Sequence, residues 1–151
     1  MKRVITMSLI MLIILATVGC KKEKAIYPEA VIIKELPVMY GAISEHGTVQ
    51  LIQSQQELNK LFNGDAPTFP EELTNIDFEK SSLAIGTAGD GRDVGKLEHR
   101  IKKRDSNKYH YSLNVLYSDA AVVVGPFSFG VIVNKLPDEA NIILEVKEIN
   151  H

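Results

Sequence analysis

The clearest pattern in the chain is an alternation of apolar and polar residues between Lys108 and Tyr117. The apolar positions are Tyr109, Tyr111, Leu113, Val115 and Tyr117, and His110, Ser112 and Asn114 lie between them. A period of two residues is typical of a strand that buries one face. We therefore expect a β-strand here, with its tyrosines directed toward a core.

The charged segment before this strand is expected to pair with it as a β-hairpin. A three-residue loop at 105–107 sets Leu97 opposite Val115 and Ile101 opposite Tyr111, whereas a two-residue loop would place charged residues among the tyrosines. Burial of one such apolar side chain contributes roughly 1.5 to 3 kcal/mol, so the three-residue loop is favoured. The opposite, polar face then carries Glu98, Arg100, Lys102, Arg104, Lys108 and His110.

Further strands and one helix follow from the rest of the pattern. The expected strands are 30–38, 48–52, 82–87, 127–133 and 142–146, with 118–124 as a loop or an edge strand. Ser54 and Glu57 have the spacing of a capping box and predict a helix over 55–62. Ala88 to Gly95 is expected to be a flexible connection. The sequence predicts one mainly β domain at 30–151, an antiparallel barrel or sandwich of seven to eight strands with one short helix.

The N-terminus has a different character. Lys2 and Arg3 precede an almost wholly apolar run, which ends at Gly19 and the chain's single cysteine, Cys20. This segment resembles a bacterial lipoprotein signal peptide, although Thr17 stands where that family usually has leucine. The resemblance implies a signal peptide at 1–19, acylation of Cys20 and a lipidated tether at 20–29. An ordinary secretory signal and a retained membrane anchor are the alternatives.

Charge and cysteine content extend this picture. Cleavage after Gly19 removes Lys2 and Arg3, which changes the formal net charge from −2 to −4, so nothing indicates a nucleic-acid partner. With Cys20 acylated, no cysteine remains for a disulfide. Lys21 follows Cys20, where aspartate is associated with retention in the inner membrane of some bacteria. We expect a lipid-anchored protein of the bacterial cell envelope, on the outer membrane, with the side of that membrane left open.

Catalytic and metal motifs are not evident in the sequence. The glycine-rich stretch 86–96 lacks the spacing of a phosphate-binding loop, and Asp90 and Asp93 are too few oxygen ligands for calcium. The hairpin register separates His99 from His110, and Ser128 lies within an expected strand rather than on a nucleophile elbow. We expect no catalytic residue, no metal and no cofactor. A hydrolase is the remaining enzymatic alternative.

Two groups of residues are candidates for binding. The basic side chains of the hairpin would suit an acidic protein or anionic lipid headgroups, although a solvated strand face is the simpler interpretation. These partner-binding candidates are Arg100, Lys102, Arg104 and Lys108. The glycine-rich stretch, with nearby tyrosines, could instead bind a small ligand or a glycan. The candidates for that ligand loop are Gly89, Asp90, Gly91, Arg92 and Asp93.

The stretch from about Ile76 to Ile149 resembles the C-terminal domain of PrcB-type subunits of bacterial protease complexes. The similar features are Ile76-Asp77-Phe78 before a strand at 82–85, a glycine-rich turn before the charged hairpin, and Gly125-Pro126-Phe127 opening a strand that ends at Lys135. In the turn, 93–96 keeps one glycine and no aromatic residue where such domains often have Thr-Gly-Gly-Tyr. The resemblance implies a membrane-anchored, non-catalytic module that binds another protein, possible partners including an envelope protease.

Overall fold

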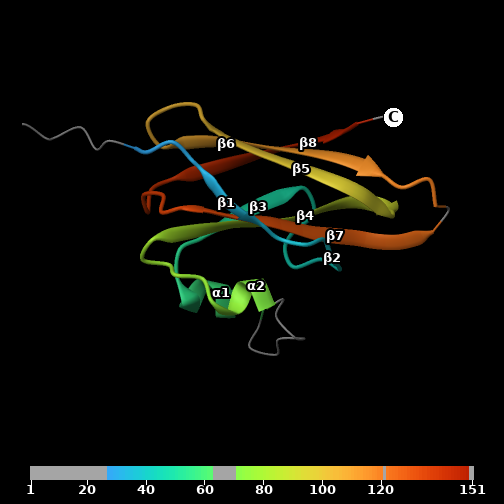
Figure 1. The fold of residues 1–151 in the computed structure, drawn as a ribbon, viewed down its shortest axis with the longest axis horizontal. Coiled ribbons are helices and arrows are strands. Elements are labelled where there is room, and N and C mark those ends of the chain that lie inside the picture. Colours follow the sequence, from blue (N-terminus) through green and yellow to red (C-terminus); the bar gives the residue numbers. More distant parts are fainter. Residues whose placement is uncertain (1–26, 63–70, 121, 150–151) are drawn as a thin grey trace, which may run out of the picture.

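A computed structural model describes residues 27–62, 71–120 and 122–149 and shows two stacked β-sheets with two short helices beneath them (Figure 1). Sheet A has the strand order β1-β7-β4-β3, and β2 also pairs with β7. Its strands are β1 (Ile32–Glu35), β2 (Met39–Tyr40), β3 (Thr48–Ile52), β4 (Ser81–Arg92) and β7 (Val123–Asn134). Sheet B has the order β5-β6-β8, formed by β5 (Val94–Lys103), β6 (Lys108–Tyr117) and β8 (Asn141–Glu148). The predicted mainly β domain of seven to eight strands is confirmed, and of the two architectures left open, barrel or sandwich, the structure is the two-sheet sandwich.

The register of the central hairpin is the one that the sequence predicts. Leu97 lies opposite Val115 and Ile101 opposite Tyr111, and the backbone N–H of Arg104 donates to the carbonyl of Lys108 at 2.8 Å. The loop therefore comprises residues 105–107. Burial alternates along β6, with the odd-numbered residues from Tyr109 to Val115 fully buried. β8 then adds to β6 in parallel, which makes sheet B mixed.

The core between the two sheets pairs small residues with large ones. Ala84 and Ala88 of β4 pack in the same cluster as Phe127 and Phe129 of β7, with Gly86 directly opposite Phe129. The ring of Tyr111, from sheet B, meets Phe129 edge-on with 5.6 Å between ring centroids. Aromatic pairs in this arrangement contribute about 0.5 to 1.5 kcal/mol beyond the area that they bury.

The glycine-rich stretch is a correction to the sequence prediction. Residues 88–95 were expected to form a flexible connection, but β4 continues to Arg92 and β5 begins at Val94. A Cβ atom at Gly89 would stand 2.6 Å from the ring of Phe127, so this glycine leaves room for an aromatic side chain. Register shifts lie on both sides of Gly91, where φ is +98°, and irregularities of this kind bend a strand. Gly89 therefore makes room for an aromatic ring, and Gly91 allows an irregular backbone conformation within the strand.

The outer face of sheet A is covered by the two helices, α1 (Gln55–Leu61) and α2 (Glu71–Thr74) (Figure 1). Leu58 and Leu73 are fully buried in a second apolar cluster on this face. The Ser54 hydroxyl accepts from the backbone N–H of Glu57 at 3.2 Å, as in the predicted capping box, while the Glu57 carboxylate accepts from the N–H of Gln53 at 2.7 Å, one residue before the N-cap. The sequence predicted one helix, so α2 is an addition. Within the described ranges, no helix is both long and apolar enough to cross a bilayer.

Two further details refine the predictions. Val146, in the strand expected at 142–146, lies opposite the buried Leu113, yet 41% of its surface is exposed because β8 is the open edge of sheet B. The predicted signal peptide at 1–19 and the lipidation site at Cys20 lie outside the described residues. Residues 27–29, the end of the predicted tether, are hydrogen-bonded to the sandwich.

Candidate functional site

The outer face of sheet B carries a group of basic side chains that we call the basic patch: Arg100, Lys102, Arg104 and Lys108. All four are exposed. Arg100 and Lys102 alternate along β5 with buried or half-buried residues, and Arg104 follows directly beyond the strand opposite Lys108. Alternate residues of a strand lie roughly 6.6 to 6.8 Å apart, so β5 presents an evenly spaced row of cations. These are the four residues that the sequence predicted as a partner-binding surface, and the structure brings them together.

The basic side chains on the outer face of sheet B fall into two groups, one with ion pairs and one without them among the described residues. Away from the hairpin turn, Lys96 binds Glu98 at 2.8 Å and Lys147 binds Glu145 at 3.0 Å. Among the described residues, no member of the basic patch forms an ion pair within 4.0 Å. The charges of Lys96 and Lys147 are therefore offset by neighbouring carboxylates, whereas the four cations of the basic patch have no such ion pair among the described residues.

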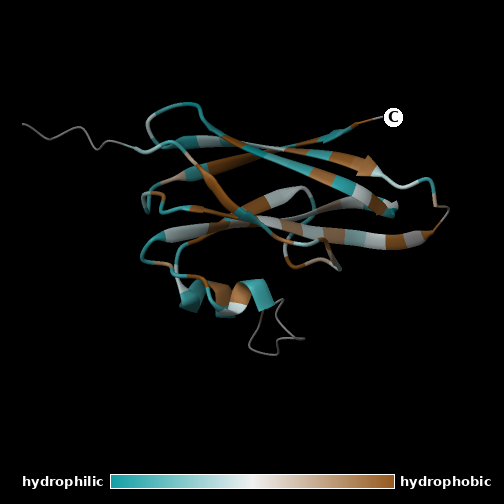
Figure 2. Ribbon diagram, in the orientation of Figure 1, coloured by the Kyte–Doolittle hydropathy of each residue, from teal (hydrophilic) through white to brown (hydrophobic). Residues whose placement is uncertain are grey.

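Hydropathy colouring shows β5 as mainly hydrophilic with hydrophobic bands between the hydrophilic ones (Figure 2). The outer face of sheet B holds six basic side chains and two carboxylates, Glu98 and Glu145. The full chain, by contrast, has a formal net charge of −2. A positive face on an acidic protein attracts negatively charged surfaces and orients them during association.

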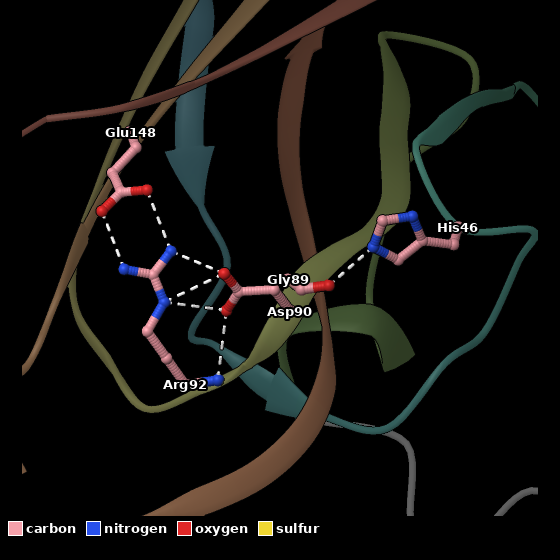
Figure 3. Close-up of polar contacts among 5 residues, drawn as sticks. All are labelled: His46, Gly89, Asp90, Arg92 and Glu148. Atoms are coloured by element: carbon pink, nitrogen blue, oxygen red, sulfur yellow. Dashed lines mark hydrogen bonds and ion pairs between the residues drawn. The ribbon is translucent and has the colours of Figure 1, made fainter. Parts of the chain in front are cut away.

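The predicted ligand loop lies at the opposite end of the sandwich, where Arg92 holds several elements together (Figure 3). Its guanidinium donates to Asp90 at 2.9 Å and to both carboxylate oxygens of Glu148, at 2.7 and 2.9 Å. The guanidinium carbon also lies 3.9 Å from the ring centroid of Tyr117. Hydrogen bonds from Arg92 lower the pKa of the carboxyls of Asp90 and Glu148. The arrangement links the end of β4 to the end of β8.

The remaining polar groups of this region are also occupied within the protein. Asp93 accepts from the hydroxyl of Tyr40 and from that of Ser118, and the Tyr40 hydrogen bond lowers the pKa of Asp93. His46 Nε2 lies 2.6 Å from the carbonyl oxygen of Gly89 (Figure 3). The site residues Gly89, Asp90, Gly91, Arg92 and Asp93 thus form a structural junction between strands.

Two tyrosines that the ligand-binding alternative relied on are inaccessible. Tyr109 and Tyr111 are fully buried, so neither ring can stack on a sugar or another ligand. Burial raises the pKa of both phenols, and each hydroxyl has a partner: Pro28 O at 2.8 Å for Tyr109 and His99 Nδ1 at 2.7 Å for Tyr111. This observation removes the rings of Tyr109 and Tyr111 from the ligand-binding interpretation and leaves the exposed Tyr40, bonded to Asp93, as an aromatic side chain beside the loop.

The histidines do not converge. His99 points toward the core against Tyr111, whereas His110 lies on the outer face with Nε2 3.4 Å from a carboxylate oxygen of Glu145. No group of three or more histidine, cysteine, aspartate or glutamate side chains suited to a metal occurs among the described residues. Ser128 is buried within β7 and donates to the carbonyl of Gly41 at 2.6 Å, so it is not on an exposed turn.

We expect His99 to make stability depend on pH. Burial lowers the pKa of His99 from 6.5, while the negative charge of Glu35 partly opposes that shift. As pH falls below about 6.5, the unfolded chain binds a proton that the folded chain resists, so the free energy of unfolding decreases until the folded-state pKa is reached. Urea denaturation between pH 7 and pH 5 should show this decrease, and His99→Gln should flatten it. An unchanged slope in His99→Gln would contradict the assignment, and His46→Gln, at an exposed position, serves as the control.

Sequence reasoning missed the features that depend on distant segments. The bonds of Arg92 to Glu148, and of Tyr109 to Pro28, join residues 56 and 81 positions apart. A lone arginine near two aspartates gives no signal of its partner on another strand. The alternation of β5 and β6, in contrast, was sufficient to place the basic patch.

Comparison of the chain with models of protein families, with curated proteins and with solved structures finds no match, so the site has to be interpreted from its own geometry.

Proposed function

We propose that this protein is a membrane-anchored lipoprotein of the bacterial cell envelope whose β-sandwich is a non-catalytic module that binds another protein. Acylated Cys20 holds the module at the membrane, on the outer membrane given Lys21 at the following position. The basic patch is the contact surface for a negatively charged region of the partner. The resemblance to PrcB-type subunits makes an envelope protease the first partner to test.

One observation carries this proposal: four cations that form no ion pair with any described residue lie together on a solvent-exposed sheet face, in a protein that is acidic as a whole. Isolated surface cations are ordinary, but here the other basic residues of the same face are paired with carboxylates. Complementary charge on a partner would increase the rate of association and exclude partners of the wrong sign. Exposed Ile143, opposite His110 in the same face, adds an apolar contact beside the cations.

Affinity capture with a matched pair of charge reversals tests the proposal. The lipidated chain is used to isolate proteins from membranes, and its binding to the copurifying protein is then measured with purified components. Arg100→Glu with Lys102→Glu should weaken binding on the order of 10-fold or more, because attraction at two positions becomes repulsion. Added salt should weaken the wild-type complex.

The control reverses two cations that are already paired on the same face. Lys96→Glu with Lys147→Glu changes the net charge equally but leaves the basic patch intact. Equal losses in the two double variants would show that only net charge matters, which would contradict a docking site at the basic patch. Circular dichroism spectra and urea midpoints of both variants establish that the fold is retained.

A further inference from the structure

The point where the chain leaves the sandwich toward Cys20 is fixed by side chains of three strands. Lys103 Nζ donates to the carbonyl of Tyr27, Tyr109 Oη to that of Pro28 at 2.8 Å, and Asn134 Nδ2 to that of Glu29 at 3.1 Å. Tyr109 is fully buried, and Asn134 Oδ1 also accepts from the backbone N–H of Val31 at 2.6 Å. The exit is therefore held at one end of the sandwich.

That end is also the end of the basic patch. Lys103 lies between Lys102 and Arg104, and Lys108 directly precedes Tyr109. In Figure 1 the described chain begins beside the turn between β5 and β6, on the side opposite the junction of β4 and β5. The paired cations Lys96 and Lys147 occupy the half of the face that is farther from the exit. The unpaired positive charge of sheet B is thus gathered next to the tether.

The tether limits how far this end can stand from the lipid. Seven residue steps separate Cys20 from Tyr27, and a fully extended chain covers at most about 3.6 Å per residue. The exit end of an acylated protein would consequently lie within about 25 Å of the acylated cysteine. The basic patch belongs to the membrane-proximal half of the sandwich.

The direction of the patch favours a protein over the lipid surface itself. The patch lies on the broad face of sheet B, while the chain leaves from the end of the sandwich, so the cations point sideways when that end faces the membrane (Figure 1). The turns at the exit end carry Asp105, Asp138 and Glu139, and Asn107 joins these two turns through Glu139 O at 3.3 Å. These three carboxylates offset the charges of Arg104 and Lys108, which flank the hairpin turn, so the end itself attracts anionic headgroups less than the broad face of sheet B would.

We infer that the partner is a protein held on the same membrane, which presents an acidic surface close to the headgroups and meets the basic patch from the side. This inference rests on the proposed function, because it assumes both the lipid anchor and a protein partner. It adds where the partner's acidic surface lies, namely close to the membrane. A soluble partner would not be restricted to that position.

Orientation is tested with the lipidated chain in vesicles of neutral phosphatidylcholine. Because Cys20 is acylated, a single introduced cysteine can carry the fluorophore. One variant has Ser106→Cys, beside the basic patch, and the other has Asp119→Cys, at the opposite end of the sandwich. Both positions are exposed. Lipids with a quencher on the headgroup should quench the label at Ser106→Cys more strongly. Equal quenching, or stronger quenching at Asp119→Cys, would overturn the inferred orientation.

Location of the partner is tested with a glutamate-rich peptide as the probe. The peptide carries an acyl chain, and either 2 or 30 glycine and serine residues separate its acidic block from that chain. Transfer of fluorescence from the Ser106→Cys label should show binding about tenfold tighter for the short spacer, because effective concentration falls with linker length. The Arg100→Glu, Lys102→Glu double variant should lose this binding.

The remaining outcomes separate the two proposals. Failure of the free peptide to bind even a soluble chain that begins at residue 20 and carries Cys20→Ala would overturn the basic patch as an acidic-protein site, and with it the proposed function. Binding of the peptide in solution with no preference for the short spacer would overturn only the membrane-level location. Salt-sensitive binding of the Cys20→Ala chain to vesicles containing phosphatidylglycerol, abolished by the double reversal, would assign the patch to lipid and overturn the protein partner.

Discussion

Gly86→Ala is expected to destabilise the sandwich by about 3 kcal/mol or more, the upper end of what an overpacked core usually costs. A Cβ atom at Gly86 would stand 2.2 Å from the carbonyl oxygen of Thr48 and 2.8 Å from the ring of Phe129. The first atom belongs to the backbone of the neighbouring strand β3, so it cannot move without separating β3 from β4. The second belongs to the aromatic pair at the centre of the core. Little of the strain can be relieved locally.

A graded series of alanine substitutions measures this effect. At Gly130 the nearest obstruction is the side-chain Cδ1 of Leu36, at 2.9 Å, which can adjust its rotamer. At Gly95 the nearest atom is the carbonyl oxygen of Leu116, at 3.3 Å. The free energies of unfolding, from urea denaturation followed by circular dichroism, should therefore decrease in the order Gly95→Ala, Gly130→Ala, Gly86→Ala. A Gly86→Ala variant as stable as Gly95→Ala would contradict the packing described for β4.

These glycines also show why the sequence misled where it did. Glycine is frequent in loops because of its backbone freedom, and it is equally needed wherever a strand must admit a large neighbouring ring. The two roles look alike in a single sequence, since the ring at Gly89 comes from Phe127, 38 positions later. The stretch was therefore interpreted as a flexible connection, although most of it is strand.

The hairpin could be predicted because its determinants are local. Alternation along β6 and a three-residue loop together leave one register that buries the apolar residues, and the structure has that register. The same local pattern places the basic patch on one exposed face. It contains no information on which cations are paired, because Lys147 and Glu145 come from β8, which joins β6 by a non-local parallel pairing.

The segment at 27–29, where the chain leaves the sandwich toward Cys20, likewise depends on contacts that are distant in sequence. The charge and the proline of residues 21–29 predicted a tether, of which the structure describes 27–29; the carbonyls of these three residues are bound by Lys103, Tyr109 and Asn134, which are distant in sequence. Tyr109→Phe should therefore cost about 1 kcal/mol through loss of its hydrogen bond to Pro28. Urea denaturation of a chain that begins at residue 20 and carries Cys20→Ala would measure this loss, and an unchanged free energy of unfolding in Tyr109→Phe would show that the exit is not held by this bond.

A larger loss is expected for Thr87→Val, which keeps the shape of the side chain and removes its oxygen. Thr87 is fully buried in β4, and its hydroxyl oxygen accepts from the backbone N–H groups of Ile43 and Ser44, at 3.2 and 3.1 Å. It also lies 3.4 Å from the hydroxyl of Ser128. Within the described residues, every buried side-chain nitrogen and oxygen has a hydrogen-bond partner. Valine would leave two backbone donors of the β2–β3 connection without their acceptor.

Each unsatisfied donor costs roughly 1 to 3 kcal/mol, and partial access of water reduces that cost, so we expect a loss of about 2 to 4 kcal/mol. Thr48→Val is the matched control, because Thr48 is the cross-strand neighbour of Thr87 and donates only to the carbonyl of Glu45, near the surface. That variant should lose less than about 1 kcal/mol. Thr87→Ser restores the oxygen and should recover much of the difference. Similar urea midpoints for the two valine variants would show that Thr87 does not hold this connection, and that its burial reflects packing alone.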